Sequence, residues 1–197
     1  MQLSELPEVI TNRSHIRYKK GDYAFSSDET IKNFYFILDG KIKISHVNPD
    51  TAKEQTIKIL KRGDMFDIVT LLDNKEHEYI STALQDSTVI TLPIDAARKL
   101  LESSQEFRSY FFTYTANELR DLENLAVDLA LYDVEERLIH LFKREFATQD
   151  GSILDGLTHE EIAALVGSVR KVVNRKLQKL KKDGIVDIKR QKIEYKK

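Results

Sequence analysis

The sequence contains no cysteine. This absence excludes disulfides, thiolate zinc sites and iron–sulfur clusters held by cysteine. The chain also lacks an apolar run of the roughly 18 to 20 residues that a membrane span needs, and its amino end lacks the charged and apolar regions of a signal peptide. We therefore expect a cytoplasmic protein with no membrane partner.

Motifs typical of enzymes are missing as well. The sequence has no nucleophile elbow, no phosphate-binding glycine-rich loop and no paired metal-ligand spacing. Adjacent acidic pairs such as Glu135-Glu136 and Glu160-Glu161 point apart on a helix, which is typical of a solvated surface. The sequence thus predicts no catalytic residues, no metal site and no enzymatic activity.

Positive charge is concentrated near the carboxyl end. The whole chain has a formal net charge of −1, but residues 158–197 hold twelve Lys and Arg against five Asp and Glu, which gives +7 there and leaves −8 for residues 1–157. The basic part can neutralise phosphates, whereas the acidic remainder would repel them. This asymmetry favours a nucleic-acid partner for the carboxyl-terminal part.

Residues 158–182 read as two short amphipathic helices. Thr158 and Glu161 have the spacing of a capping box that starts the first helix. Gly167 marks the turn, and Ser168 is expected to cap the second helix. This pattern of start, turn and second start predicts a helix-turn-helix.

The second of these helices has two unlike flanks. Because an α-helix repeats every 3.6 residues, one flank collects the polar residues Arg170, Lys171, Asn174, Arg175 and Gln178. The opposite flank collects Val169, Val173, Leu177 and Leu180, which must pack on another surface, with Ile162, Ala163 and Leu165 available on the first helix. Such a helix fits the major groove of double-stranded DNA. The alternative is a solvated basic face on an ordinary helical hairpin.

A β-hairpin is predicted after Gly184, because residues 185–188 and 192–195 alternate across Arg190-Gln191. Appended to the two helices, it makes a winged helix, with Lys192 and its neighbours at the tip expected to contact phosphate. The residues expected at the DNA are Thr158, His159, Ser168, Val169, Arg170, Lys171, Asn174, Arg175, Lys189 and Arg190.

The amino-terminal half has the rhythm of an all-β sandwich or roll, with short β-branched and aromatic runs between residues 16 and 93. Strands are predicted at 33–38, 41–47, 54–60 and 88–92. Tight hairpin turns are predicted at three places, which are Asp39-Gly40, Asn48-Pro49-Asp50 and Arg62-Gly63-Asp64.

From residue 94 to 147 the apolar period becomes helical. A coiled-coil seam is formed by Phe112, Thr115, Leu119, Leu122, Ala126 and Leu129. A second copy of the helix would bury this seam, so we expect a homodimer with these residues at its interface; the alternative is packing on the chain's own β domain, a role expected instead for Phe111 and Leu125. A further helix at 134–146 is expected to support the DNA-binding unit, followed by a loop with a short strand at 152–154.

This order of elements resembles the Crp/Fnr (cyclic-AMP receptor protein/FNR) family of bacterial transcription regulators. The resemblance covers almost the whole chain and is carried by YKKGD at 18–22, FYFILDGKIK at 34–43, LKRGDMF at 60–66, LTHEEIA at 157–163 and GSVRKVVNR at 167–175. It implies an α+β chain with three parts. These are an N-terminal double-stranded β-helix (a jelly roll like the cyclic-nucleotide-binding domain) as sensor at 1–100, a long dimerisation helix at 101–131 and a winged helix-turn-helix at 132–197.

The resemblance also implies partners and residue roles. A homodimer would bind a palindromic operator through a recognition helix at about 169–182, and RNA polymerase would be a further partner. The base-reading roles fall on Arg170 and Arg175, because an arginine fork donates to guanine O6 and N7. Lys171 departs from the family, in which many relatives hold a glutamate that accepts from cytosine N4.

The sensor part departs from the cyclic-nucleotide binders of the family, which carry a Gly-Glu pair and, about ten residues later, an Arg-Ser or Arg-Thr pair. Those positions hold Asp67-Ile68 and Glu78-Tyr79. Two acidic side chains would repel a phosphodiester where an arginine and amides are needed. We therefore expect an unidentified effector that is not cAMP.

The cofactor is unknown from the sequence. Haem is compatible with the composition, because His15, His46, His77, His140 or His159 offers an axial ligand. The alternative function is thus a cyclic-nucleotide- or haem/NO-responsive regulatory module of the same fold. Activation and repression are equally compatible with these residues.

Overall fold

The computed structural model describes residues 14–147, 153–189 and 192–196. They divide into two compact units. One contains the residues up to His46 together with Lys58–Leu122, and the other contains Val47–Ile57 and Glu123–Lys197. None of the helices in these described stretches is long and apolar enough to cross a membrane.

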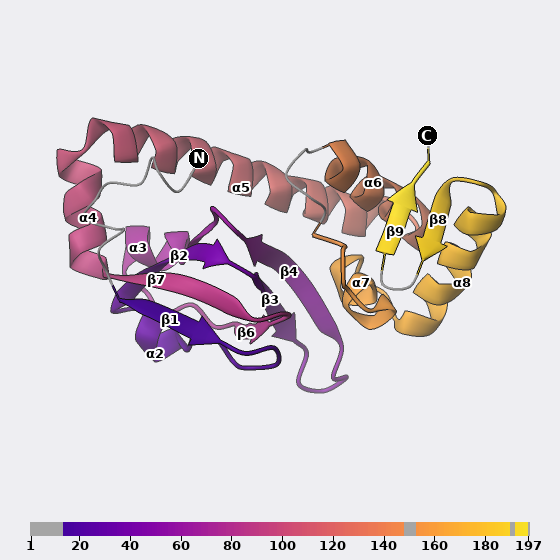
Figure 1. Ribbon diagram of the computed structural model, residues 1–197, viewed down its shortest axis with the longest axis horizontal. Helices are drawn as coiled ribbons and strands as arrows, with labels where there is room; N and C mark the ends of the chain where they lie inside the picture. The colour runs from indigo at the N-terminus through magenta and orange to yellow at the C-terminus, as the bar shows by residue number, and fades with distance from the viewer. Residues whose placement is uncertain (1–13, 148–152, 190–191, 197) are drawn as a thin grey trace. The chain divides into compact units, whose positions relative to one another are not determined.

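The amino-terminal part is a roll of short strands (Figure 1). The predicted strands are present, with ends shifted by one residue at most. The elements are β1 (His15–Tyr18), α2 (Ser27–Thr30), β2 (Asn33–Asp39), β3 (Lys41–Val47), β4 (Glu54–Lys61), β5 (Met65–Phe66), α3 (Ile68–Asp73), β6 (Ile80–Ala83) and β7 (Ser87–Pro93).

Two antiparallel sheets make up the roll, one with the strand order β1-β7-β2-β5 and the other with β4-β3-β6. Strand β2 buries both of its faces, because successive side chains of a strand point to opposite sides. Tyr35 and Ile37 join a cluster with Ile42 of the second sheet. Phe34 and Phe36 join a second cluster that includes residues of the helices after the roll. The roll therefore has a core on each side of this strand.

The structure corrects two of the predicted turns. Gly40 does not close a hairpin, because β2 and β3 lie in different sheets. The chain instead changes sheet at Gly40, which has φ +101°, and a Cβ at this position would lie 2.5 Å from Ser87 Cα. Gly63 marks a second change of sheet, between β4 and β5. The turn at Asn48 is confirmed, since its Oδ1 accepts from the backbone N–H groups of Asp50 and Thr51.

Two helices follow the roll, α4 (Ile94–Ser103) and α5 (Gln105–Leu131). The first half of α5 packs on the roll through Phe107 and Phe111, which are buried beside Phe34 and Phe36. The Tyr110 hydroxyl donates to Gly63 O at 3.0 Å. One face of α5 is therefore fixed to the β domain of its own chain, as predicted for Phe111.

The carboxyl-terminal part contains α6 (Val134–Ala147), α7 (His159–Leu165), α8 (Arg170–Lys182), β8 (Val186–Lys189) and β9 (Lys192–Tyr195). Helix α6 buries Leu138, Leu141 and Phe142, as its periodicity predicts, while Ile139 is half-buried. The predicted hairpin is confirmed as the antiparallel pair β8–β9. The prediction of a short strand at 152–154 is wrong for the described residues, because Ile153 and Leu154 lie in a turn. Ser152 lies outside the described residues.

The sheet change at Gly40 leads to a stability prediction with a matched control. Gly40→Ala is expected to lower the free energy of unfolding more than Gly21→Ala, since both glycines have positive φ but a Cβ at Gly21 meets nothing within 4 Å. The left-handed backbone alone costs about 1–2 kcal/mol, and the clash with the Ser87 backbone adds about 1–3 kcal/mol. Denaturant unfolding measures the difference, and equal losses would contradict the close approach.

Candidate DNA-binding site

The first helix of the motif, α7, begins with the predicted capping box. Thr158 Oγ1 accepts from Glu161 N at 3.2 Å, and the Thr158 N–H donates to Glu161 Oε2 at 2.5 Å. These two bonds satisfy backbone groups that a helix start leaves without partners. His159 is the first residue of the helix and is half-buried.

The turn between α7 and α8 differs from the prediction at Ser168. Helix α8 begins at Arg170 with Val169 as its N-cap residue, and no side chain caps it. Ser168 is one residue too early for that role, and its backbone N–H closes α7 by donating to Ala163 O at 2.9 Å. The predicted serine cap is therefore wrong. Gly167 turns the chain with φ +66°, where a Cβ would lie 2.5 Å from Leu129 Cδ2.

Helix α8 packs through most of its predicted apolar stripe. Val173, Leu177 and Leu180 are fully buried. Val169 was predicted to belong to the stripe, but it is exposed because it precedes the first helical residue and does not follow the helical period. The facing surface comes from the buried residues of α7, which are Ile162, Ala163 and Ala164; Leu165 is only half-buried.

The polar flank of α8 is open to solvent. Arg170, Lys171, Asn174 and Arg175 are all exposed. Across the described stretches of the chain, none of the three cations among them forms an ion pair. Three positive charges and one amide thus stand together on one side of a helix whose other side is buried, as the sequence predicts.

Two other lysines of α8 serve a different purpose, which the sequence did not reveal. Lys176 Nζ lies 3.0 Å from Glu135 Oε2, and Lys179 Nζ lies 2.5 Å from Glu135 Oε1. The hydrogen bonds from Lys179 and Lys176 hold the pKa of Glu135 below its usual value. Glu135 therefore connects the start of α6 to α8 by ion pairs with two lysines of α8.

The hairpin β8–β9 presents less free charge than predicted. Glu194 accepts from Lys189 Nζ at 2.9 Å, and Lys192 Nζ lies 3.6 Å from the same carboxylate. These lysines lower the pKa of Glu194, with Lys189 contributing most. Lys189 remains exposed, whereas Arg190 lies outside the described residues.

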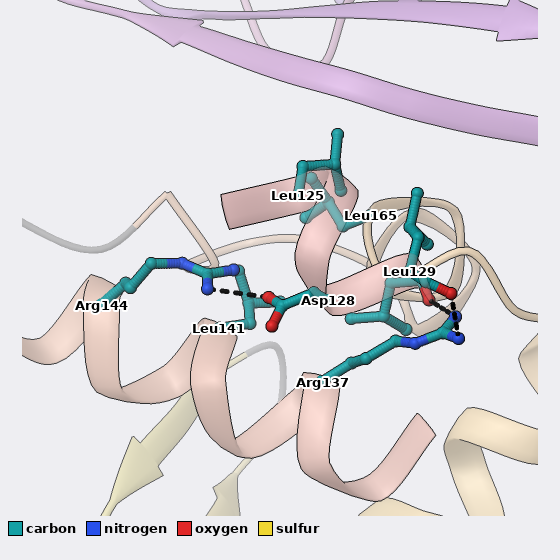
Figure 2. Close-up of a pocket in the computed structure, with 8 residues that line it drawn as sticks. Leu125, Asp128, Leu129, Arg137, Leu141, Arg144 and Leu165 are labelled. Carbon is teal, nitrogen blue, oxygen red and sulfur yellow. Dashed lines mark hydrogen bonds and ion pairs between the residues drawn. The ribbon is translucent and has the colours of Figure 1, made fainter. Parts of the chain in front are cut away.

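A single arginine of α6 joins three segments of this part. Arg137 donates through Nη2 to Leu129 O of α5 at 2.9 Å and through Nη1 to Val166 O at 3.1 Å (Figure 2). Its Nε donates to Tyr132 O at 2.8 Å. The guanidinium thus satisfies carbonyls at the end of α5 and in the turn before α8. Its five-donor fork suits this role, but nothing in the local sequence pattern marks it.

Asp67, which the sequence comparison with cyclic-nucleotide binders singled out, has its partners within the chain. The Asp67 carboxylate is only 2% exposed and caps α3, accepting from Val69 N at 3.1 Å and Thr70 Oγ1 at 2.8 Å. His77 Nδ1 lies 3.0 Å from Asp67 Oδ2, and this hydrogen bond raises the pKa of His77. Asp67 therefore has a structural role that the sequence did not predict.

Aromatic rings occupy the space beside this carboxylate. Tyr79 packs edge-on against Phe66 with ring centroids 4.9 Å apart, and Phe66 stacks on Phe25 at 5.2 Å. Burial raises the pKa of Tyr79. These rings belong to or border the core cluster between the two sheets.

Comparison with known protein families gives two matches. A cyclic nucleotide-binding domain matches residues 15–104, and a Crp-like helix-turn-helix domain matches residues 136–197. The chain is 31% identical over 169 residues to a CRP-like cAMP-activated global transcriptional regulator of Mycobacterium tuberculosis, which spans 82% of the chain and 75% of the relative. It is 27% identical over 196 residues to the anaerobic regulatory protein of Bacillus subtilis, spanning 94% and 80%.

Solved structures agree on the fold. FixK2 from Bradyrhizobium japonicum superposes with a TM-score of 0.80 at 19% identity, covering 93% of this chain and 92% of that one. A CooA mutant from Carboxydothermus hydrogenoformans superposes with a TM-score of 0.79 at 22% identity, covering 97% and 87%. The predicted fold class, a β-roll followed by a winged helix-turn-helix, is confirmed. Members of the Crp/Fnr family of DNA-binding transcription regulators are not enzymes and typically act as dimers. Because both domains match in this order, and because one relative is 31% identical along most of its length, the chain belongs to this family.

Proposed function

We propose that this regulator binds a palindromic operator as a homodimer and reads it with α8, the recognition helix predicted at about 169–182. The observation that carries the proposal is the division of charge on α8. Lys176 and Lys179 are ion-paired with Glu135, and Lys176 also lies 3.5 Å from Asp133 Oδ2, whereas Arg170, Lys171 and Arg175 are exposed and form no ion pair among the described residues. A helix that leaves cations unpaired on one side only is suited to a polyanion on that side.

Each exposed residue of α8 suits a part of the major groove. Arg170 and Arg175 donate bidentate pairs to guanine O6 and N7, and the Asn174 amide matches adenine N6 and N7. Lys171 donates and never accepts, so an operator read by this chain differs from those read by relatives with glutamate at that position. We further propose that six residues lie at the sugar–phosphate backbone. They are Thr158 and His159 at the start of α7, Ser168 and Val169 before α8, and Lys189 and Arg190 of the hairpin segment.

The dimer is supported by the face of α5 that the chain leaves uncovered. Phe112, Leu119 and Leu122 are 60%, 64% and 52% exposed, although they lie on the same helix as the buried Phe107 and Phe111. The roll covers one apolar face of the first half of α5 and leaves Phe112, Leu119 and Leu122 of the predicted seam open to a second copy. Of the other predicted seam residues, Thr115 is half-buried, Ala126 is exposed, and Leu129 is half-buried beside Val166 and Arg137 of its own chain. Two α8 helices related by a two-fold axis would then enter successive major grooves, about 34 Å apart.

The effector is proposed to be something other than cAMP. The Asp67 carboxyl group is buried and bonded to Thr70 and His77 at the position where we infer that a phosphodiester would bind in the cyclic-nucleotide binders of the family. Tyr79 and Phe66 add bulk beside it. The Mycobacterium tuberculosis relative is named for activation by cAMP, and these residues argue against extending that property to this chain. RNA polymerase as a further partner and a cytoplasmic location are proposed from the family alone.

The base-reading roles of α8 are tested by truncation. Arg170→Ala and Arg175→Ala are each expected to weaken discrimination of the cognate operator by about 1–3 kcal/mol, since each loses a bidentate pair. Gel-shift titration on a palindrome selected from random duplexes provides the measurement. Lys143→Ala is the control, because Lys143 is exposed on α6 and its loss removes the same charge elsewhere. Unchanged discrimination in both arginine variants would rule out α8 as the reading helix.

Dimerisation through α5 is tested by placing a charge in the seam. Leu119→Glu is expected to weaken the dimer by at least about 3 kcal/mol, because the new carboxylate would be buried without a partner. Leu72→Glu on α3 serves as the control, since Leu72 is 58% exposed and lies outside α5. Sedimentation velocity distinguishes monomer from dimer, and a Leu119→Glu protein that remains fully dimeric would refute this interface.

Cyclic AMP is expected to leave the protein unchanged. Isothermal titration should show no saturable heat, and operator affinity in the gel shift should be the same with and without the nucleotide, because Asp67 repels the phosphodiester. The Mycobacterium tuberculosis relative provides the positive control. Saturable binding accompanied by a change in operator affinity would contradict the proposal.

A further inference from the structure

A buried carboxylate connects the end of α5 to the middle of α6. Asp128 lies one turn before the end of α5 and is 6% exposed. Its two oxygens have different partners on α6. His140 Nδ1 lies 2.7 Å from Oδ1, and Arg144 Nη1 donates to Oδ2 at 2.8 Å (Figure 2). His140 and Arg144 are four residues apart and therefore share one face of α6.

This arrangement leaves little freedom at the corner between the two helices. A carboxylate whose two oxygens are both engaged is fixed in orientation as well as in distance. Leu125, Leu141 and Leu165 line the same pocket as Asp128 and Arg144 (Figure 2), and the carboxylate is buried although the side chains of His140 and Arg144 are 31% and 40% exposed. The ring of Tyr132 stands edge-on to His140 with centroids 4.6 Å apart. Together these contacts hold α6 at one angle to the last turns of α5.

The same helix α6 also holds the recognition helix. Glu135, at its start, pairs with Lys176 and Lys179 of α8, and Arg137 donates to Val166 O in the turn before α8. A rotation of α6 relative to α5 would therefore displace α8 as well. In a dimer joined through α5, that displacement changes the separation of the two α8 helices.

We propose that Asp128 is a positioning residue which, through His140 and Arg144, fixes the angle between α5 and the DNA-binding helices and thereby sets the half-site spacing that the dimer accepts. The inference rests on the proposed function, because spacing has a meaning only for a dimer on a palindrome. Asp128 contacts no DNA in this scheme. Its effect is on the geometry of binding and leaves the phosphate contacts of α8 in place.

The backbone of the corner also has support from residues other than Asp128. Asp133 Oδ1 accepts from the N–H groups of Glu135 and Glu136 and caps α6. Arg137 satisfies carbonyls at the end of α5. Asp128→Asn keeps the size of the side chain, removes its charge and replaces one of the two accepting oxygens with an amide nitrogen that donates.

The test measures affinity against spacing. The wild-type protein first selects a palindrome from random duplexes, and operators are then made with one and two base pairs added or removed between the half-sites. Coupling between two sites is typically about 5- to 150-fold. Asp128→Asn is therefore expected to reduce the preference for the selected spacing over the altered ones by at least about fivefold, while binding to a random duplex is unchanged.

Two further variants make the outcome specific. Asp121→Asn removes the same charge from an exposed position of α5 and is expected to keep the wild-type spacing preference. Arg144→Gln removes one partner while leaving Asp128 in place and is expected to relax the preference as Asp128→Asn does, which also covers the case of an Asp128 variant that fails to fold.

The possible results separate this inference from the proposed function. An equal loss of affinity at every spacing, or an unchanged preference in Asp128→Asn and Arg144→Gln, would overturn the positioning role while leaving operator binding established. A wild-type protein that selects no palindrome would overturn the proposed function, and this inference with it.

Discussion

Helix α5 has two apolar faces, and a single chain covers only one of them. The face carrying Phe107 and Phe111 is buried beside the β-roll, which fixes that half of the helix to the sensor part. The face carrying Leu119 and Leu122 remains exposed. Exposed apolar surface of this extent is unfavourable in water, and a second copy of the helix is the simplest cover. The proposed two-fold symmetry of the DNA-binding surface follows from this constraint.

Charge on α8 is arranged by its contacts with α6. Glu135 forms ion pairs with Lys176 and Lys179, while Arg170, Lys171 and Arg175 are exposed and form no ion pair among the described residues. The same carboxylate holds α8 against α6, so one residue contributes to both electrostatics and geometry. Asp128 and Arg137 continue this chain of polar contacts to the end of α5. Recognition by α8 therefore depends on residues that are proposed to touch no base.

In the β-roll, family membership does not determine which effector binds. The fold is that of a cyclic nucleotide-binding domain, yet Asp67 uses its carboxylate to cap α3 and to bind His77. A buried carboxylate whose oxygens already have hydrogen-bond partners needs no ligand, and it disfavours a second anion such as a phosphodiester beside it. A fold specifies where a ligand site would lie, whereas the side chains at that place decide which ligand fits.

Local periodicity determined much of this protein. Apolar residues that alternate every two positions predict the strands of the roll, and apolar residues that repeat every 3.6 positions predict α6 and the buried stripe of α8. The spacing of Thr158 and Glu161 predicts the start of α7. Each of these features depends on neighbours in the chain. Tertiary structure alone decided that Gly40 changes sheet, that Val169 lies outside its stripe, and that Asp128 meets His140 and Arg144. Strand partners and ion pairs are chosen among residues distant in sequence, and no local spacing encodes that choice.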